Sequence, residues 1–322
     1  MKNRRSFLQQ LGLLSAGVVL TPAMISCSSS DSGAAEETTA EADTTTTTSE
    51  TTDGAASAVI DTVGIQLYTL RELIFKDVTG VIGKVAKAGY QDVETFGYSK
   101  ERGFFGMEPK AFRDLLNSNG LISSSGHYDF GQYMTSGNAD VVKTCIEAGQ
   151  AIGQDYITVP YLGEEVRGSA DAYKAVAEKL NKAGELCNAA NMRLAYHNHD
   201  FEFKKFGDQT GYDILLKETD PSLVNFEADL YWFVRGGQDP IEYFKQSPGR
   251  YVMWHVKDMD KNSPEKNTEI GSGSINYKEI FNQAKLSGVQ RIFVEQENFA
   301  ASMDPFQSIG QSYTYIKNTL MQ

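Results

Sequence analysis

Short apolar runs alternate with longer amphipathic stretches from about residue 59 to the end of the sequence. Runs rich in Val, Ile, Tyr and Phe are typical of buried strands, and apolar residues at helical spacing are typical of helices that cover a sheet. The expected strands are residues 62–69, 92–96, 121–127, 156–160, 193–196, 224–229, 251–256 and 291–295. The expected helices are residues 78–88, 109–117, 139–152, 170–189, 212–218, 240–246, 277–286 and 305–320.

Strand and helix therefore alternate regularly, in eight units over about 260 residues, which is the usual size of a (β/α)8 TIM barrel. An open, doubly wound sheet is the alternative, but it normally shows a glycine-rich phosphate turn after its first strand. Here Leu70, Arg71 and Glu72 follow the first strand instead. We expect residues 59–322 to form one α/β barrel domain, with its active site at the carboxyl ends of the strands.

The first 58 residues have a different composition. Arg4 and Arg5 precede a short apolar stretch at residues 11–20, which is typical of an export signal, and the Arg-Arg-Ser-Phe-Leu string resembles the twin-arginine type. Met-Ile-Ser before Cys27 resembles a lipoprotein cleavage site, so we expect residues 1–27 to be the signal and Cys27 to be lipidated. A soluble secreted protein cut nearby is the alternative.

Residues 28–58 are rich in Ser, Thr, Asp and Glu and offer little apolar surface to bury, so they predict a disordered tether. The sequence thus indicates an exported protein, a periplasmic or outer-membrane lipoprotein whose only membrane contact is its anchor. The formal net charge of −12 disfavours nucleic acid as a partner. Cys145 and Cys187 both fall in helical patterns, and we interpret them as buried free thiols.

All four histidines of the chain fall at or just beyond the ends of expected strands: His127, His197, His199 and His255. Histidines that served packing or solubility would also occur on helices, and none does. His197 and His199 share a face of the fifth strand, with Glu202 just beyond its end. Two imidazoles and a carboxylate suit a divalent metal or proton transfer, although capping of the strand is the simpler interpretation.

The fifth to eighth strands end near three carboxylates and one imidazole, which would make a hard, mostly oxygen site. Such a site favours Mn²⁺ or Mg²⁺, with Co²⁺ as the alternative, and no thiolate takes part. The expected ligands are Glu202, Asp229, His255 and Glu295.

Five segments, at residues 64–71, 196–203, 229–232, 249–258 and 294–297, resemble the xylose-isomerase-like TIM barrels. That superfamily includes sugar epimerases, hydroxypyruvate isomerase, inosose dehydratase and endonuclease IV, and the acidic chain does not resemble the last branch. In the family a Glu, an Asp, a His and a Glu at the ends of strands five to eight bind one divalent metal. The resemblance places these ligands on the same four residues. His197 remains the alternative to Glu202, and Glu297 is the alternative to Glu295.

The resemblance implies a metal-dependent sugar isomerase or epimerase that removes a proton beside a carbonyl through a metal-stabilised enediolate. Glu202 and Glu295 would shuttle the proton. Lys257 would stabilise oxyanion charge or move a proton, and an ion pair with Asp258 or Glu227 is the alternative.

The same interpretation assigns the remaining polar and aromatic side chains at the strand ends to the substrate, a sugar or keto-sugar. For the aromatic residues, a place in the barrel core is the alternative. The expected substrate-binding residues are Glu94, His127, His197, His199, Tyr68 and Trp232.

Two other functions fit the same residues. A lyase or hydratase acting on keto-sugars or 3-keto-glycosides would use the same metal and lose a β-oxygen. A sugar-binding lipoprotein without catalysis would keep only the binding residues, and the presence of both acid/base candidates argues against it.

Overall fold

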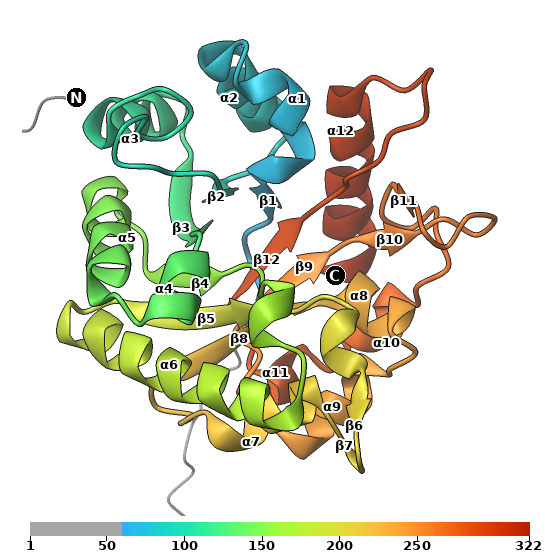
Figure 1. Cartoon of the computed structure of the whole chain (residues 1–322). Helices are drawn as coiled ribbons and strands as arrows, with labels where there is room; N and C mark the ends of the chain where they lie inside the picture. Colours follow the sequence, from blue (N-terminus) through green and yellow to red (C-terminus); the bar gives the residue numbers. More distant parts are fainter. Residues whose placement is uncertain (1–59) are drawn as a thin grey trace, which may run out of the picture. The chain divides into compact units, whose positions relative to one another are not determined.

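The computed structural model describes residues 60–322; the expected export signal, Cys27 and the tether up to residue 58 lie outside the described residues. Within the described part, eight parallel strands close into a barrel in the order β1-β12-β9-β8-β5-β4-β3-β2 (Figure 1). The expected (β/α)8 barrel is therefore confirmed. The strands are β1 Gly64–Gln66, β2 Asp92–Thr95, β3 Ile122–His127, β4 Tyr156–Val159, β5 Arg193–His197, β8 Val224–Asp229, β9 Met253–Val256 and β12 Arg291–Val294.

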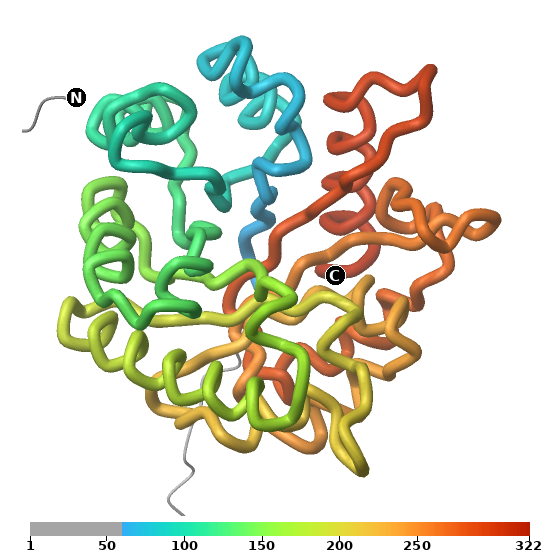
Figure 2. Tube along the Cα trace, viewed as in Figure 1, coloured from blue at the N-terminus to red at the C-terminus, as the bar shows by residue number. Residues whose placement is uncertain are grey.

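Helices lie around the outside of the barrel, and the chain passes once around it, so that β1 pairs with β12 (Figure 2). Three short helices, α1, α4 and α8, were not expected from the sequence. Helix α8 directly follows β8, whereas α1 and α4 follow connecting segments. The α-helices are α1 Arg71–Ile74, α2 Val78–Lys87, α3 Pro109–Ser118, α4 Gly131–Ser136, α5 Ala139–Ile152, α6 Ala170–Ala189, α7 Gly211–Glu218, α8 Leu230–Arg235, α9 Pro240–Gln246, α10 Tyr277–Phe281, α11 Ala284–Ser287 and α12 Pro305–Tyr315. Among the described residues, no helix is both long and apolar enough to cross a membrane.

Alternation along each strand separates two layers of side chains. On β5, Leu194 and Tyr196 belong to the large apolar core, whereas Ala195 belongs to a second, small apolar cluster. Phe293 of that small cluster packs against Gly64. A Cβ at position 64 would lie 2.5 Å from the Phe293 ring, so glycine is needed there. The small cluster consists of Tyr156, Ala195, Val252, Met253 and Phe293.

Local sequence signals account for the helix boundaries. Thr210 and Asp213 form a capping box at the start of α7, and Pro109 occupies the first turn of α3. Two hairpins of two-residue strands follow β5 and β9: β6 Lys205–Phe206 with β7 Gln209–Thr210, and β10 Asp258–Met259 with β11 Asn267–Thr268. Strands this short carry too little alternation to be recognised in a sequence.

Candidate metal centre and active site

The carboxyl ends of β8, β9 and β12 bring three of the expected ligands together. Asp229, His255 and Glu295 each offer a ligand atom within 4.8 Å of the others. His255 Nδ1 lies 3.2 Å from Glu295 Oε2 and 3.9 Å from Asp229 Oδ2. His197 on β5 stands beside them, with its Nε2 3.9 Å from the same Asp229 oxygen. Asp229, His255 and Glu295 therefore converge on one point at the mouth of the barrel, and His197 borders it through Asp229.

The two carboxylate oxygens of Asp229 have different surroundings. Its Oδ1 accepts a hydrogen bond from the backbone N–H of Trp232 and so caps α8. Its Oδ2 is buried and has no hydrogen-bond partner within residues 60–322. A buried carboxylate oxygen without a donor is costly, and a cation at this point would satisfy it.

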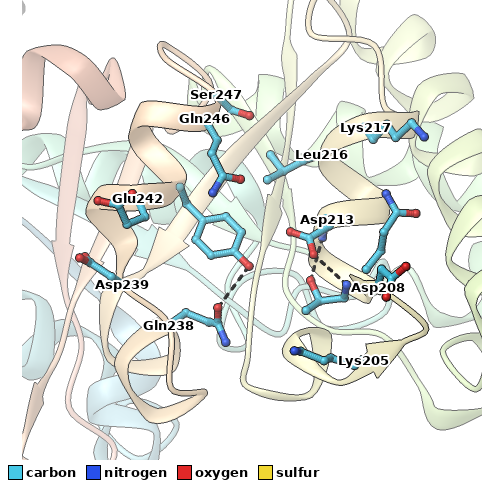
Figure 3. Close-up of a pocket in the computed structure, with 13 residues that line it drawn as sticks. Lys205, Asp208, Asp213, Leu216, Lys217, Gln238, Asp239, Glu242, Gln246 and Ser247 are labelled. Carbon is cyan, nitrogen blue, oxygen red and sulfur yellow. Dashed lines mark hydrogen bonds between the residues drawn. The ribbon is translucent and has the colours of Figure 1, made fainter.

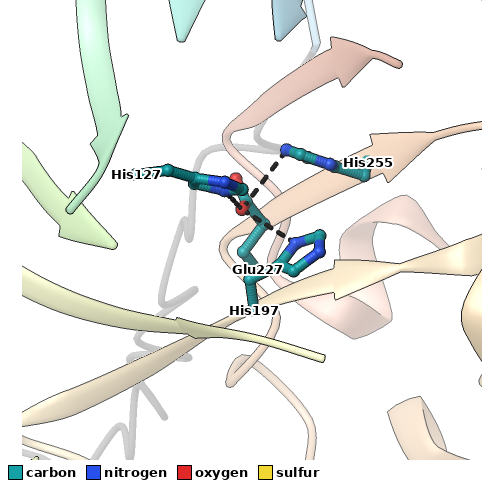
Figure 4. A group of neighbouring side chains, drawn as sticks. All are labelled: His127, His197, Glu227 and His255. Atoms are coloured by element: carbon teal, nitrogen blue, oxygen red, sulfur yellow. Dashed lines mark hydrogen bonds and ion pairs between the residues drawn. The ribbon is translucent and has the colours of Figure 1, made fainter. Parts of the chain in front are cut away.

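His197 and His255 each have a second ring nitrogen that does not face Asp229, and this nitrogen lies close to a buried carboxylate. His255 Nε2 lies 2.7 Å from Glu94 Oε2, and His197 Nδ1 lies 3.2 Å from Glu227 Oε2 (Figure 4 shows His197 and Glu227). His127 links the two acids, with its Nε2 2.7 Å from Glu227 and 3.2 Å from Glu94. Metal-binding histidines typically pair their other ring nitrogen with a carboxylate in this way, which fixes the tautomer and the ring orientation.

A second group of candidate ligands lies just below the first. His127, His197, Glu227 and His255 also have ligand atoms within 4.8 Å of one another (Figure 4), but they use the opposite nitrogens of His197 and His255. Their contacts to Glu227 Oε2 are 2.7, 3.2 and 3.3 Å, which are hydrogen-bond distances. Within residues 60–322, Asp229 Oδ2 and Glu227 Oε1 both lack a donor, so the distances decide between the two groups. The contacts of Asp229 Oδ2 are 3.8–3.9 Å, which is longer than a hydrogen bond and leaves room for an ion in the upper group.

Burial and charge set the ionisation of the carboxylates. Desolvation raises the pKa of Glu227 to about 7 and that of Asp229 to about 6. Burial opposes the ionisation of Glu295 too, but the Lys257 ammonium and the His255 hydrogen bond outweigh it and lower the pKa of Glu295. Glu94 behaves likewise, because His127 and His255 lower its pKa to about 2.

Lys257 is buried beside the predicted ligands. Its Nζ contacts Glu297 Oε1 and lies 3.3 Å from Glu295 Oε2 and 3.8 Å from Asp229 Oδ2. Burial opposes its charge, but Glu295 and Asp229 raise the pKa of Lys257. The structure therefore brings Lys257 into the site as an ammonium. Its ion-pair partners are Glu295, Glu297 and Asp229 rather than Asp258 or Glu227.

Glu202 is not brought to this cluster. Its Oε1 accepts a hydrogen bond from the Tyr196 hydroxyl (2.6 Å) and its Oε2 one from the backbone N–H of His199 (2.9 Å). Tyr196 belongs to the core between barrel and helices, because His197 faces the interior and neighbouring residues of a strand alternate. Burial raises the pKa of Glu202 to about 7. The place beside Asp229 that was expected for Glu202 is occupied by His197.

A cleft of about 530 Å³ opens above the cluster. Of the expected substrate-binding residues, Tyr68, His127, His197 and His199 line it, together with Glu295 and Glu297. Glu94 lies below as the partner of the histidines and also accepts hydrogen bonds from Gln66 and Ser125.

Among the described residues, two polar atoms near this cleft are free, one on the loop after β5 and one on α8. His199 packs against Trp232, with 5.3 Å between ring centroids. In the described part of the chain, His199 Nδ1 and Trp232 Nε1 are buried without hydrogen-bond partners. Burial, then the charge of Lys257, lowers the pKa of His199 to about 3, so its ring is neutral.

A separate hollow of about 660 Å³ lies between the β6–β7 hairpin, α7 and α9 (Figure 3). Two pairs of its polar groups are hydrogen-bonded to each other: Thr210 with Asp213, and Tyr243 with Gln238. No histidine is found among the described residues that line it. The chemistry of the chain is therefore concentrated at the barrel mouth.

Sequence reasoning named Glu227 only as an alternative ion-pair partner of Lys257, although it is central to the hydrogen-bonded layer. Its signal was its position two residues before Asp229, which places both side chains on one face of β8. Three histidines on neighbouring strands, His127, His197 and His255, approach this one carboxylate.

Comparison with known proteins also finds a TIM-barrel family. The sequence profile of the family described as "Xylose isomerase-like TIM barrel" matches residues 82–319. A curated inosose dehydratase from Clostridium tetani (strain Massachusetts / E88) is 28% identical over 190 residues, which cover 53% of this chain and 62% of that protein. The match therefore spans less than two thirds of that relative.

Solved structures extend the comparison over most of the described chain. A sugar phosphate isomerase/epimerase from Parabacteroides distasonis ATCC 8503 is 29% identical, with a TM-score of 0.72, and the match covers 84% of this chain and 98% of that one. The IolI protein, solved with a zinc atom, is 15% identical with a TM-score of 0.64, covering 80% of this chain and 97% of that one. The second likeness supports the fold alone.

Proposed function

We propose that this chain, which belongs to the xylose isomerase-like TIM barrel family, is a divalent-metal-dependent sugar isomerase or epimerase. The reaction would begin with removal of a proton from the carbon beside a carbonyl. The observation that carries the proposal is the convergence of Asp229, His255 and Glu295 under an open cleft, with one buried Asp229 oxygen that no donor in residues 60–322 satisfies.

Four side chains would hold the cation: His197 through Nε2, Asp229 through Oδ2, His255 through Nδ1 and Glu295 through Oε2. Two imidazoles with two carboxylates suit Mn²⁺ better than Mg²⁺, which prefers oxygen ligands and retained waters. The bound cation would supply electrostatic stabilisation of negative charge on the carbonyl and hydroxyl oxygens of the sugar.

Proton transfer would fall to groups on opposite walls of the mouth. Glu295 would receive the proton from carbon, because it lines the cleft and its carboxylate is ionised. The nearby Lys257 ammonium and His255 keep it ionised but also lower its basicity. His199 stands across the mouth, because β8 and β9 separate β5 from β12 in the barrel. Its neutral ring, with an Nδ1 that lacks a partner among the described residues, would exchange a proton on the other side of the sugar.

A lyase is the second candidate, and the curated inosose dehydratases favour it. It would share the first proton removal and then expel an oxygen from the β-carbon of a keto-sugar or a 3-keto-glycoside. The leaving oxygen would need a proton, which is the task we give to His199 in the isomerase. The two reactions therefore differ in the substrate presented rather than in the cation site.

The test incubates Mn²⁺-loaded protein with free aldoses, ketoses, keto-sugars and 3-keto-glycosides in D2O and follows the mixture by NMR. Exchange of the α-hydrogen with interconversion of sugars supports the isomerase, and elimination products support the lyase. Asp229→Asn should abolish either reaction, whereas Glu242→Gln, in the separate hollow of Figure 3, should leave it unchanged. Binding without exchange for every sugar would contradict both enzyme proposals.

A further inference from the structure

We infer that the site takes an unphosphorylated sugar that carries a second ring, as a glycoside or a disaccharide does. This inference rests on the proposed function, because it places the reacting sugar at the cation site and the second ring in the outer part of the same cleft. It is carried by two features of the cleft, its charge and its aromatic walls.

The cleft is acidic. Four carboxylates line it, and among the described residues of its lining there is neither lysine nor arginine. A phosphate dianion is normally bound by Arg or Lys or by free backbone N–H groups at a helix start. The cleft-lining residues with charge are Asp129, Glu165, Glu295 and Glu297.

Two groups near the cleft could provide positive charge, the Lys257 ammonium and the start of α4, and both already contact carboxylates. The Lys257 ammonium is shared between Glu295, Glu297 and Asp229. At the start of α4, the backbone N–H of Gly131 donates to the carboxylate of Asp129 (2.8 Å), which brings a negative charge to the place where a phosphate would bind. A sugar phosphate in the outer part of the cleft would therefore meet carboxylates and no lysine or arginine among the described lining residues.

The two nearest arginines support aromatic rings instead of lining the cleft. The Arg71 guanidinium lies 4.5 Å from the Tyr68 ring centroid and donates to two backbone carbonyls. Arg167 lies 3.6 Å from the Phe201 centroid and donates to the Tyr161 hydroxyl. Cation–π contacts of this kind hold an exposed ring in place.

Aromatic rings line the cleft from two strands that are not neighbours in the barrel. Tyr68 follows β1 and Tyr161 follows β4, and β2 and β3 separate these strands around the barrel. Both rings are unusually exposed for large apolar side chains, at 39% and 48%. Tyr68 packs edge-on against Phe96, and Tyr161 packs edge-on against His199. Because both exposed rings line the same cleft as Phe96, they give it apolar surface that a ligand can cover.

The size of the cleft agrees with a ligand of two rings. A volume of about 530 Å³ lies within the range of roughly 300–1,000 Å³ for pockets that bury drug-sized ligands. One pyranose beside His197 and Glu295 would fill only the deep end. The apolar face of a second ring would then lie between Tyr68 and Tyr161, where it gains contact with aromatic surface.

The experiment measures binding to the full-length, Mn²⁺-loaded protein by calorimetry with matched sets of ligands. Each set contains a sugar, its phenyl glycoside, a disaccharide that carries it at one end, and its 6-phosphate, for glucose, galactose and mannose. In at least one set, the phenyl glycoside or the disaccharide should bind about tenfold or more tightly than the parent sugar, and the 6-phosphate more weakly. Tyr161→Ala should remove this advantage, and Tyr161→Phe, which keeps the ring, should retain it.

Two results overturn the inference: a 6-phosphate that binds more tightly than its parent sugar, or no glycoside or disaccharide that exceeds its parent in any set. The Mn²⁺ content of the same sample separates this failure from that of the proposed function. Protein that binds no Mn²⁺ contradicts the cation site itself. Mn²⁺-loaded protein that prefers phosphates contradicts the substrate class alone.

Discussion

At the scale of single residues, the position of a side chain along its strand decides whether the sequence can place it. Asp229, His255 and Glu295 were predictable, because each is on the inward-facing side near the end of a strand. Glu202 was not, because it lies five residues beyond His197, where the path of the loop decides its direction. Alternation is a reliable guide only as far as the strand continues.

His197 and Glu202 can be separated by metal affinity. We expect His197→Ala to weaken Mn²⁺ binding by more than the roughly 10- to 100-fold that is typical for loss of an outer partner, because it removes a ligand. Glu202→Gln should leave the affinity nearly unchanged, since Glu202 contacts Tyr196 and the backbone of His199. Calorimetric titration with Mn²⁺ checks both variants. The reverse order of affinities would restore Glu202 as the ligand.

Glu94 provides a test of the layer below the ligands. Glu94→Gln keeps the size of the side chain but removes the charge that lies 2.7 Å from His255 Nε2. We expect Mn²⁺ affinity to fall by about 10- to 100-fold while the fold is retained, because His255 loses the carboxylate that orients it. Equal affinity in the variant and the parent protein would show that the histidine does not depend on this contact.

At the scale of elements, the sequence placed long strands and helices well and short elements poorly. The helix expected at residues 277–286 is divided into α10 and α11, and the strand expected at 62–69 ends at Gln66 and continues as a 3₁₀ turn. Helix α8 was missed because its start depends on Asp229, whose side chain caps it. The sequence indicates that Asp229 ends a strand, but it does not indicate that the same side chain also starts the next helix.

The junction between β5 and its loop depends on the buried hydrogen bond from Tyr196 to Glu202. Tyr196→Phe should lower the free energy of unfolding by about 1–3 kcal/mol, because it leaves a buried carboxylate oxygen without its donor. Tyr212→Phe is the matched control: its hydroxyl is buried and has no partner in the part of the chain that the structure covers. Chemical denaturation measures both. Similar losses in the two variants would contradict an anchoring role for Glu202.

At the scale of the whole molecule, the repeated strand–helix pattern was sufficient to predict the barrel, and the eight parallel strands close as expected. The pattern could not predict the hydrogen-bonded layer inside the barrel, because contacts such as Glu94 with His255 join residues 161 positions apart in the chain. These contacts arise only when the barrel closes.

The stability of the barrel should depend on pH through Asp92, which is buried and held by Ser124. Burial raises the pKa of Asp92 from 3.8 to about 7, so the folded state binds this proton more tightly than the unfolded chain does. Its contribution is complete below about pH 4 and is lost as the pH rises through 7, at about 1.4 kcal/mol for each pKa unit.

Asp92→Asn cannot titrate and keeps the contacts to Ser124. Relative to this variant, the parent protein should therefore lose a few kcal/mol of its free energy of unfolding between pH 4 and pH 8. Denaturation curves at several pH values measure the difference. A difference that does not change with pH would contradict the proposed protonation of Asp92.

The most direct test of the cation site is a crystal structure of the Mn²⁺-soaked protein with anomalous diffraction recorded at the manganese edge. We expect one strong anomalous peak between His197 Nε2, Asp229 Oδ2, His255 Nδ1 and Glu295 Oε2. A peak on the opposite nitrogens, beside His127 and Glu227, or no peak at the barrel mouth, would contradict this assignment.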